Sequence, residues 1–192
     1  MLYINQRRYP NIPYPTDMDT EGSPMQKKSV KEAGCGLCSL CMVVDHLTTK
    51  KLGLVECRDL SIALGANRKP GTDMKIIGPV VAERFGLSYA ETSDIKKVNK
   101  TLHEGGEVII NAGGDHDGYS GIFTHGGHFM VIISEKGGKY CVLDPSQHKA
   151  KFKQALLDKK LSIDGYFIYT DAALLLKESE NRSPAFYLFA RK

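Results

Sequence analysis

The segment from Gly34 to Leu47 constrains the fold of this chain more than any other. Beyond Gly36, its apolar residues follow the i, i+3, i+4, i+7 spacing of a helix with one buried stripe. These residues are Leu37, Leu40, Cys41, Val44 and Leu47. The pattern predicts a buried helix whose first turn begins next to Cys35.

Cys35 has the surroundings of a reactive thiol. At the start of a helix, unpaired N–H groups and the positive end of the macrodipole favour the thiolate. Gly34 and Gly36 allow a tight entry turn and leave room for a substrate backbone to approach the sulfur. Because most free cysteines are small buried apolar residues, the alternative is that Cys35 only fills the core. Cys38 and Cys41 continue the helical spacing, and we interpret them as ordinary core residues.

Composition narrows the class of protein and its partners. The 192 residues can form one domain with a sizeable core, and 42% apolar with 25% charged residues is ordinary for a globular protein. Lys and Arg number 26 against 22 Asp and Glu, and the lysine pairs are scattered, so we expect no nucleic-acid partner. No apolar run reaches the ~20 residues of a membrane span, so no membrane segment is expected.

Cysteine usage and the N-terminus indicate a compartment. The five cysteines, three of them crowded between positions 35 and 41, do not resemble a disulfide framework. The first residues, from Met1 to Asn5, lack the pattern of a signal peptide. We therefore expect a cytoplasmic protein, or a secreted one if a leader has been removed. The sequence carries no indication of the oligomeric state.

The chain changes its periodicity near its middle. Residues 1–30 contain four prolines between positions 10 and 24 and predict an extended arm. Apolar spacing predicts helices at 54–64, at 72–85 with Thr72 as cap, and at 95–102. From residue 107 the pattern favours strands at 107–111, 128–134, 139–143, 165–170 and 185–190, with helical pieces near 152–158 and 171–178. We expect one α+β domain over 1–192, with an arm at 1–30, a mainly helical part at 31–105 and a mainly β part at 106–192.

A predicted hairpin brings a histidine and a carboxylate together. Residues 135–138, Glu-Lys-Gly-Gly, are a turn signal between two strands. Folding the chain there places His128 and Asp144 at the same open end of the sheet, within one or two residue pairs. A carboxylate beside a histidine holds one tautomer and stabilises the imidazolium, which can then activate a thiol. Each residue alone has a structural explanation, as a polar strand end and a turn opener, but the combination with Cys35 favours catalysis.

Two segments contain residue types that can bind a metal ion, but neither has a complete ligand pattern. The glycine-rich residues 112–127 hold Asp115, His116, Asp117 and His125, but in no defined ligand spacing, and we interpret them as a mobile loop. Cys35, Cys38 and Cys41 have the spacing of iron–sulfur ligands, yet a fourth ligand is missing nearby and the segment is a predicted buried helix. We expect no metal and no cofactor.

Four groups of residues resemble the motifs of one family. They are Asn5-Gln6, Gly34-Cys35-Gly36 with Ser39 and Met42, Gly126-Gly127-His128-Phe129, and Asp144-Pro145. In this order they are similar to the papain-like cysteine peptidases related to the bacteriocin-processing, double-glycine leader peptidases. The match extends from Gln6 to Pro145, and the last ~45 residues lie outside the recognisable pattern, although the N-terminal helices packed on a C-terminal antiparallel sheet fit the family fold.

The resemblance implies roles for individual residues. Cys35 would be the nucleophile, His128 the general base and acid, and Asp144 the residue that orients the histidine. Gln6 would donate from its side-chain amide to the oxyanion, together with the backbone N–H of Cys35. On spacing alone Gln6 is a polar residue on an exposed arm, and Gln26 is the second choice for its role. The implied substrate is a peptide or protein.

The sequence departs from the family in two places. Relatives commonly carry Pro-Thr where this chain has Leu37-Cys38, next to the thiol. The transporter-linked members have a membrane domain attached, and this chain has none, so we expect no role in peptide export by this polypeptide alone. Free-standing relatives vary in substrate, so the double-glycine specificity does not transfer. Three alternatives to a peptidase remain open. They are an acyltransferase or transglutaminase-like enzyme with the same triad, an inactive relative that binds peptides, and a cysteine-rich metal or redox module.

Overall fold

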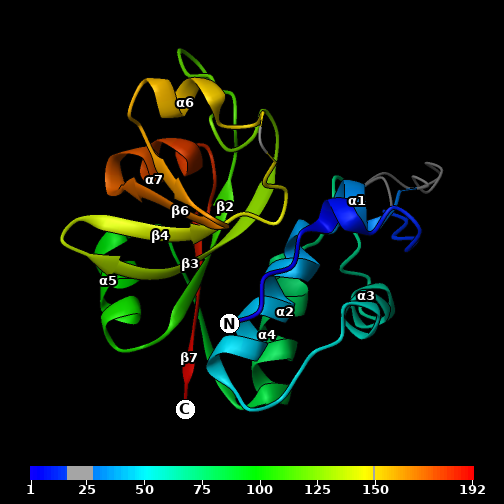
Figure 1. The fold of residues 1–192 in the computed structure, drawn as a ribbon. Coiled ribbons are helices and arrows are strands. Elements are labelled where there is room, and N and C mark those ends of the chain that lie inside the picture. The colour runs from blue at the N-terminus through cyan, green and yellow to red at the C-terminus, as the bar shows by residue number, and fades with distance from the viewer. Residues whose placement is uncertain (17–27, 149) are drawn as a thin grey trace.

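An antiparallel sheet forms the centre of the molecule (Figure 1). The computed structural model describes residues 1–16, 28–148 and 150–192. Within them seven strands are arranged in the order β1-β7-β2-β3-β4-β6-β5, and every neighbouring pair is antiparallel. The strands are β1 (Leu87–Thr92), β2 (Glu107–Ala112), β3 (His128–Lys136), β4 (Lys139–Leu143), β5 (Ser162–Asp164), β6 (Phe167–Asp171) and β7 (Phe186–Arg191).

Both faces of the sheet are buried, as alternation along β2 shows. Ile109 belongs to the hydrophobic cluster on one face, whereas Val108 and Ile110 belong to the cluster on the other. Since successive side chains of a strand point to opposite faces, a continuous apolar run is what a strand covered on both sides requires. The mainly apolar residues of β2 and β3 are therefore explained by helices on both sides.

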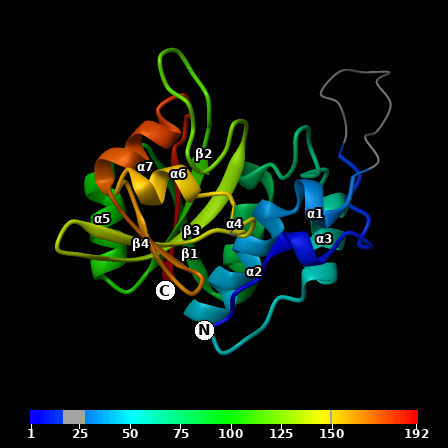
Figure 2. The ribbon, with the colours of Figure 1, turned by 45° about the horizontal axis from the view of Figure 1, so that its top comes forward.

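The N-terminal helices cover one face and later helices cover the other (Figure 2). On the first face α2 (Cys35–Leu47) lies against β3, accompanied by α1 (Val30–Ala33), α3 (Leu54–Ala63) and α4 (Met74–Phe85). On the second are α5 (Ile95–His103), α6 (Lys153–Leu157) and α7 (Ala172–Ser179). The expected α+β class, with N-terminal helices packed on an antiparallel sheet, is confirmed.

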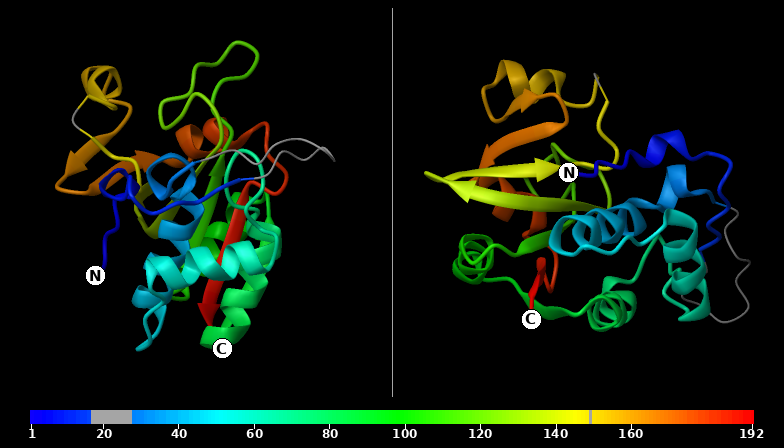
Figure 3. Two further views of the ribbon diagram at one scale, coloured as in Figure 1. Left: turned by 90° about the vertical axis from the view of Figure 1, so that its right-hand side faces the viewer. Right: turned by 60° about the horizontal axis from the view of Figure 1, so that its bottom comes forward.

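The N-terminal arm connects the helical layer to the end of β4 (Figure 3). The backbone N–H of Gln6 donates to the carbonyl of Pro145 at 2.7 Å, and the Tyr3 hydroxyl donates to the Asp144 carbonyl at the same distance. The Tyr3 ring stacks on Tyr166 with centroids 4.8 Å apart. A short 3-10 helix, Gln6–Arg8, interrupts the extended path that the prolines predict.

Some local details differ from expectation. The helix predicted to be capped by Thr72 begins at Met74, and the side chain of Asp73 caps it by accepting from the Lys75 N–H. The Thr72 hydroxyl is instead engaged by the buried Tyr14 hydroxyl at 2.9 Å, so tertiary contact overrides its capping preference. Helix α1 and strand β5 were not expected, because both are too short to show a periodic pattern. No helix in the described part of the chain combines the length and hydrophobicity needed to cross a membrane.

Candidate active site

Cys35 is the first residue of α2, and its side chain is half-buried. At this position the helix has no internal acceptor for the Cys35 N–H, which stays available to a substrate. Burial raises the pKa of the thiol, but a hydrogen bond and the charge of His128, with the backbone N–H groups of Phe129 and Gly36, outweigh it. The net pKa of Cys35 is lowered, so the thiolate is favoured.

Other cysteines behave in the opposite way. Burial raises the pKa of Cys38 well above its ordinary value, and raises that of Cys141 to about 11. The pKa of Cys57 is also raised well above its usual range, first by a hydrogen bond with Cys41 and then by burial. Cys35 therefore differs from these thiols in its electrostatic surroundings.

The β3–β4 hairpin brings His128 and Asp144 into contact. His128 begins β3 and Asp144 directly follows β4, and the His128 Nε2 atom lies 2.7 Å from Asp144 Oδ1. Val131 pairs with Leu143, and a register shift farther along the hairpin completes the alignment. Burial lowers the pKa of His128, but the charge and hydrogen bond of Asp144 and the contact with Cys35 raise it to about 9. With Nε2 bonded to Asp144, Nδ1 is the ring nitrogen left for the sulfur.

Two further residues, Ser146 and Lys151, hold Asp144, which is fully buried. Its Oδ1 atom accepts from the Ser146 N–H at 2.7 Å, and its Oδ2 atom accepts from the Lys151 ammonium at 2.5 Å. The Ser146 hydroxyl contacts both Asp144 Oδ1 and His128 Nε2. Burial raises the pKa of Asp144, yet His128 and Lys151 together hold it well below its usual range. The carboxylate is therefore ionised and fixed in orientation.

Sequence reasoning did not identify Lys151 or Ser146. Ser146 follows Asp-Pro in a common turn, where the aspartate accepts from the N–H two residues on, so that local signal was present. Lys151 lies seven residues beyond Asp144, outside any regular element, and no spacing rule points to it. Only the fold of the segment after β4 brings its ammonium to the carboxylate.

Gln6 is buried, contrary to the exposed position that spacing alone indicates. Its Nε2 atom donates to the carbonyl of Lys31 at 2.9 Å, and its Oε1 atom is buried without a partner. The first contact uses one of two amide hydrogens, so the second can still be donated. The structure holds Gln6 between Pro145 and helix α1, directly before the Cys35 helix. Gln26, the second choice, lies outside the described residues.

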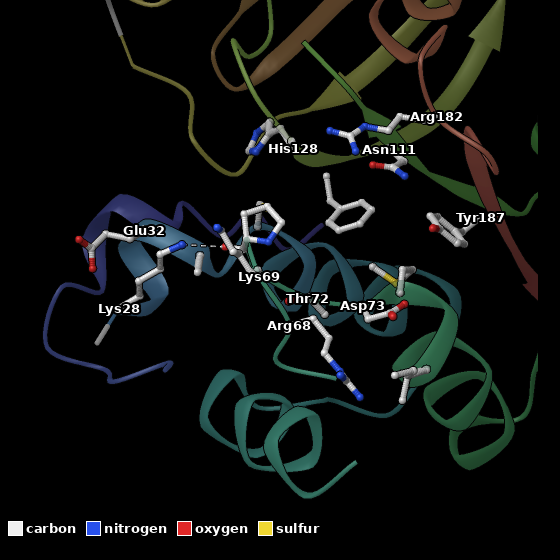
Figure 4. A pocket seen from close by; sticks show the side chains of 18 residues that line it. Lys28, Glu32, Arg68, Lys69, Thr72, Asp73, Asn111, His128, Arg182 and Tyr187 are labelled. Carbon is white, nitrogen blue, oxygen red and sulfur yellow. Dashed lines mark hydrogen bonds between the residues drawn. The ribbon is translucent and has the colours of Figure 1, made fainter. Parts of the chain in front are cut away.

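A cavity of about 450 Å³ opens beside Cys35 and His128 (Figure 4). Its lower wall in that view comes from residues 68–76 of the helical layer, and its upper wall from the sheet side with Asn111 and Arg182. The volume is that of a typical small-ligand site. Because Cys35 and His128 both line this cavity, a ligand bound there would meet both groups.

The glycine-rich loop is tied to α7 by a buried carboxylate. Glu178 accepts from the Tyr119 hydroxyl at 2.6 Å, from the Ile122 N–H at 2.5 Å and from the Phe123 N–H at 3.3 Å. Asp115 pairs with His125 at 3.0 Å in the same loop. Among the described residues, no group of three or more His, Cys, Asp or Glu could hold a metal ion. The loop that leads into His128 is thus organised by hydrogen bonds.

Comparisons with known proteins identify the fold. No family model matches the chain, and no curated protein matches it in sequence. Among solved structures, the peptidase domain of Streptococcus ComA, a bifunctional ABC transporter involved in quorum sensing, is similar with a TM-score of 0.53 and 14% identity, over 82% of this chain and 91% of that one. A Bacillus anthracis protein described as a C39-like peptidase has a TM-score of 0.53 and 13% identity, over 84% and 90% of the two chains.

These likenesses confirm the resemblance at the level of the fold. The chain has the papain-like fold of the C39 peptidase domains. At such low identity they do not assign activity or residue roles, which have to be argued from the chemistry of this site.

Proposed function

We propose that this protein is a cysteine peptidase, or more broadly a thiol hydrolase, that cleaves a peptide or amide bond. The observation that supports this best is the 2.7 Å hydrogen bond between His128 and Asp144, with Cys35 and His128 lining one cavity of about 450 Å³ and His128 lowering the pKa of the Cys35 thiol. The lowered pKa of Cys35 and the raised pKa of His128 favour a thiolate–imidazolium pair. That pair is the activated form of a nucleophilic cysteine.

The proposed reaction passes through a thioester. The Cys35 thiolate attacks the carbonyl carbon, and the negative charge that develops on oxygen is stabilised by the Cys35 N–H and the second amide hydrogen of Gln6. The tetrahedral intermediate expels the amine as His128 delivers its proton to the leaving nitrogen. His128 then takes a proton from water, whose oxygen attacks the thioester and releases the acid and the thiolate.

Asp144 acts on the imidazole and not on the substrate. Its hydrogen bond to Nε2 keeps the proton on that nitrogen in the neutral ring, which leaves Nδ1 to exchange a proton with the sulfur and the leaving group. Lys151 and Ser146 occupy other acceptor sites of the carboxylate and prevent it from rotating.

A peptide-like thiol-reactive probe tests the proposal at near-neutral pH. We expect Cys35 to be modified ahead of the other four cysteines, as mapped by mass spectrometry. Cys35→Ala should abolish both labelling and peptide hydrolysis, whereas the control Cys141→Ala should retain them because that buried thiol has a raised pKa. Indifferent labelling of all cysteines, or hydrolysis that survives Cys35→Ala, would end the peptidase proposal. An amine added to the reaction distinguishes the two alternatives, because hydrolysis releases the free acid whereas acyl transfer forms an amide with the added amine.

A further inference from the structure

The cavity beside the candidate triad has a cationic group, Arg182, that forms no ion pair with any acidic residue in the described part of the chain. Arg182 lies between α7 and β7, with its backbone N–H donating to the Ser179 carbonyl at 3.0 Å. Its Nε atom is buried without a hydrogen-bond partner, and Nη2 makes only a 3.5 Å contact with the Gly113 carbonyl. Within the described residues no carboxylate forms an ion pair with this guanidinium. A half-buried guanidinium without an ion-pair partner is energetically unfavourable, and a bound anion would offset that cost.

The guanidinium lies close to the reacting groups. A Cβ atom added to Gly127 would stand 3.3 Å from Arg182 Nη2, and Gly127 directly precedes His128. In Figure 4 the guanidinium points along the upper wall of the cavity in the direction of His128, with the Asn111 amide beside it. The Asn111 Nδ2 atom makes a long bond, 3.4 Å, to the Pro184 carbonyl, and the Asn111 side chain also has a hydrogen bond with the Tyr187 hydroxyl. Two side chains with hydrogen-bond donors thus share one wall near the site of bond cleavage.

The charges around the cavity favour an anion over a cation. Among the lining residues that the structure describes, Lys28, Arg68, Lys69 and Arg182 are cationic, and Glu32 and Asp73 are acidic. Both carboxylates are already engaged at helix starts, Glu32 in the capping box of α1 and Asp73 as the N-cap of α4. Cationic groups therefore outnumber acidic ones among the described lining residues, and Arg182 is the cationic group on the sheet side.

We propose that Arg182, assisted by Asn111, binds a carboxylate of the substrate, so that the site selects peptides with an acidic residue close to the scissile bond. The guanidinium fork matches a carboxylate in two parallel N–H···O contacts, which is a geometry that lysine cannot reproduce. The inference rests on the proposed function, because it concerns the same cleft. It specifies the class of substrate that the cleft accepts.

Peptidyl electrophiles that modify Cys35 test this without a known natural substrate. Pairs of probes differ only in Asp against Asn, or Glu against Gln, at one, two or three residues from the electrophile. With the wild-type protein we expect the acidic probe of at least one pair to modify Cys35 about tenfold faster or more. Arg182→Gln should reduce that ratio to about one, since the acid and the amide then meet the same neutral wall.

Matched variants separate this site from general charge attraction. Arg182→Lys should keep part of the preference, and Lys97→Gln, which removes one exposed cation from α5, should keep all of it. Equal rates for acid and amide in every pair, or a preference that survives Arg182→Gln, would overturn the role of Arg182 while Cys35 is still modified. If no probe modifies Cys35 in any variant, the proposed peptidase function itself fails.

Discussion

At the scale of the residue, Gln6 has an environment that its place in the sequence does not indicate. It is buried near the start of the N-terminal arm, ahead of the prolines, with one amide hydrogen on the Lys31 carbonyl. The other hydrogen is the proposed oxyanion donor. Since one such donor contributes about 3 kcal/mol to transition-state stabilisation, we expect Gln6→Ala to lower kcat/KM by roughly a hundredfold or more.

A control reaction of Cys35 that forms no oxyanion shows whether Gln6→Ala affects the oxyanion alone. Alkylation of Cys35 by a small haloacetamide displaces a halide directly, so its rate should change little in Gln6→Ala if the fold and the thiolate are intact. Gln154→Ala, at an exposed position of α6, is the matched control and should leave peptide hydrolysis unchanged. Wild-type hydrolysis by Gln6→Ala would remove this side chain from the mechanism.

The two shifted pKa values predict a bell-shaped pH profile of kcat/KM. The acid limb should lie below the ordinary thiol range, because the pKa of Cys35 is lowered and activity appears as the thiol loses its proton. The alkaline limb should lie near pH 9, where His128 loses the proton that it must donate to the leaving amine. A profile that rises only through the ordinary thiol range would contradict this assignment.

The variant Lys151→Met tests whether the alkaline limb of the pH profile reports the titration of His128 or of another group. Without the ammonium next to Asp144, the negative charge felt by the imidazole increases, so the pKa of His128 rises. The alkaline limb should move to higher pH in this variant. Lys153→Met, at an exposed residue of α6, should leave the limb in place. An alkaline limb that Lys151→Met does not move would show that His128 does not set it.

At the scale of the element, the start of α2 can pack closely against Thr72 and Phe129 because residue 36 is a glycine, without a side chain. A Cβ atom on Gly36 would stand 2.7 Å from Thr72 Cβ and 3.2 Å from Phe129 Cδ2. Overpacking costs about 1–3 kcal/mol, against a gain of about 0.5–1 kcal/mol from replacing glycine within a helix. We therefore expect Gly36→Ala to lower the free energy of unfolding by about 1 kcal/mol and to slow the modification of Cys35.

A second glycine provides the control for Gly36. A Cβ atom on Gly126 would meet nothing within 4 Å, and its φ lies outside the left-handed region. Gly126→Ala should therefore leave stability nearly unchanged or raise it slightly in denaturant unfolding. Equal stabilities for the two variants would show that α2 has room to move away from Thr72 and Phe129.

At the scale of the whole molecule, a buried ion pair joins three distant segments. His46 near the end of α2 contacts Glu107 at the start of β2 at 2.9 Å, and its Nε2 atom lies 2.7 Å from the Leu2 carbonyl. Breaking such a pair leaves an uncompensated buried charge, so His46→Leu should cost about 3–5 kcal/mol in unfolding free energy. The double variant His46→Leu with Glu107→Leu should recover much of this loss, because neither charge then remains buried. If the double variant instead loses as much unfolding free energy as the two single variants together, His46 and Glu107 are not coupled.

Much of the architecture follows from local patterns in the sequence. The apolar spacing after Gly36 determined helix α2, and the short, mainly apolar segments on either side of the turn at residues 135–138 determined the hairpin. Because register in a hairpin is set by its turn, the proximity of His128 and Asp144 could be predicted from a separation of only 16 residues. The fold class followed from the change of periodicity near residue 107.

Tertiary structure decided the contacts between segments that are far apart in the chain. Whether Cys35 meets His128, whether Gln6 is buried, and which cation reaches Asp144 depend on how the helical layer, the arm and the segment after β4 pack together. No periodic pattern encodes such contacts, since they come from the mutual fit of several elements and not from one turn or one helix. The sequence by itself thus determined the elements and the hairpin pair, whereas packing alone placed Cys35, His128 and Arg182 around one cavity and buried Gln6 beside helix α1.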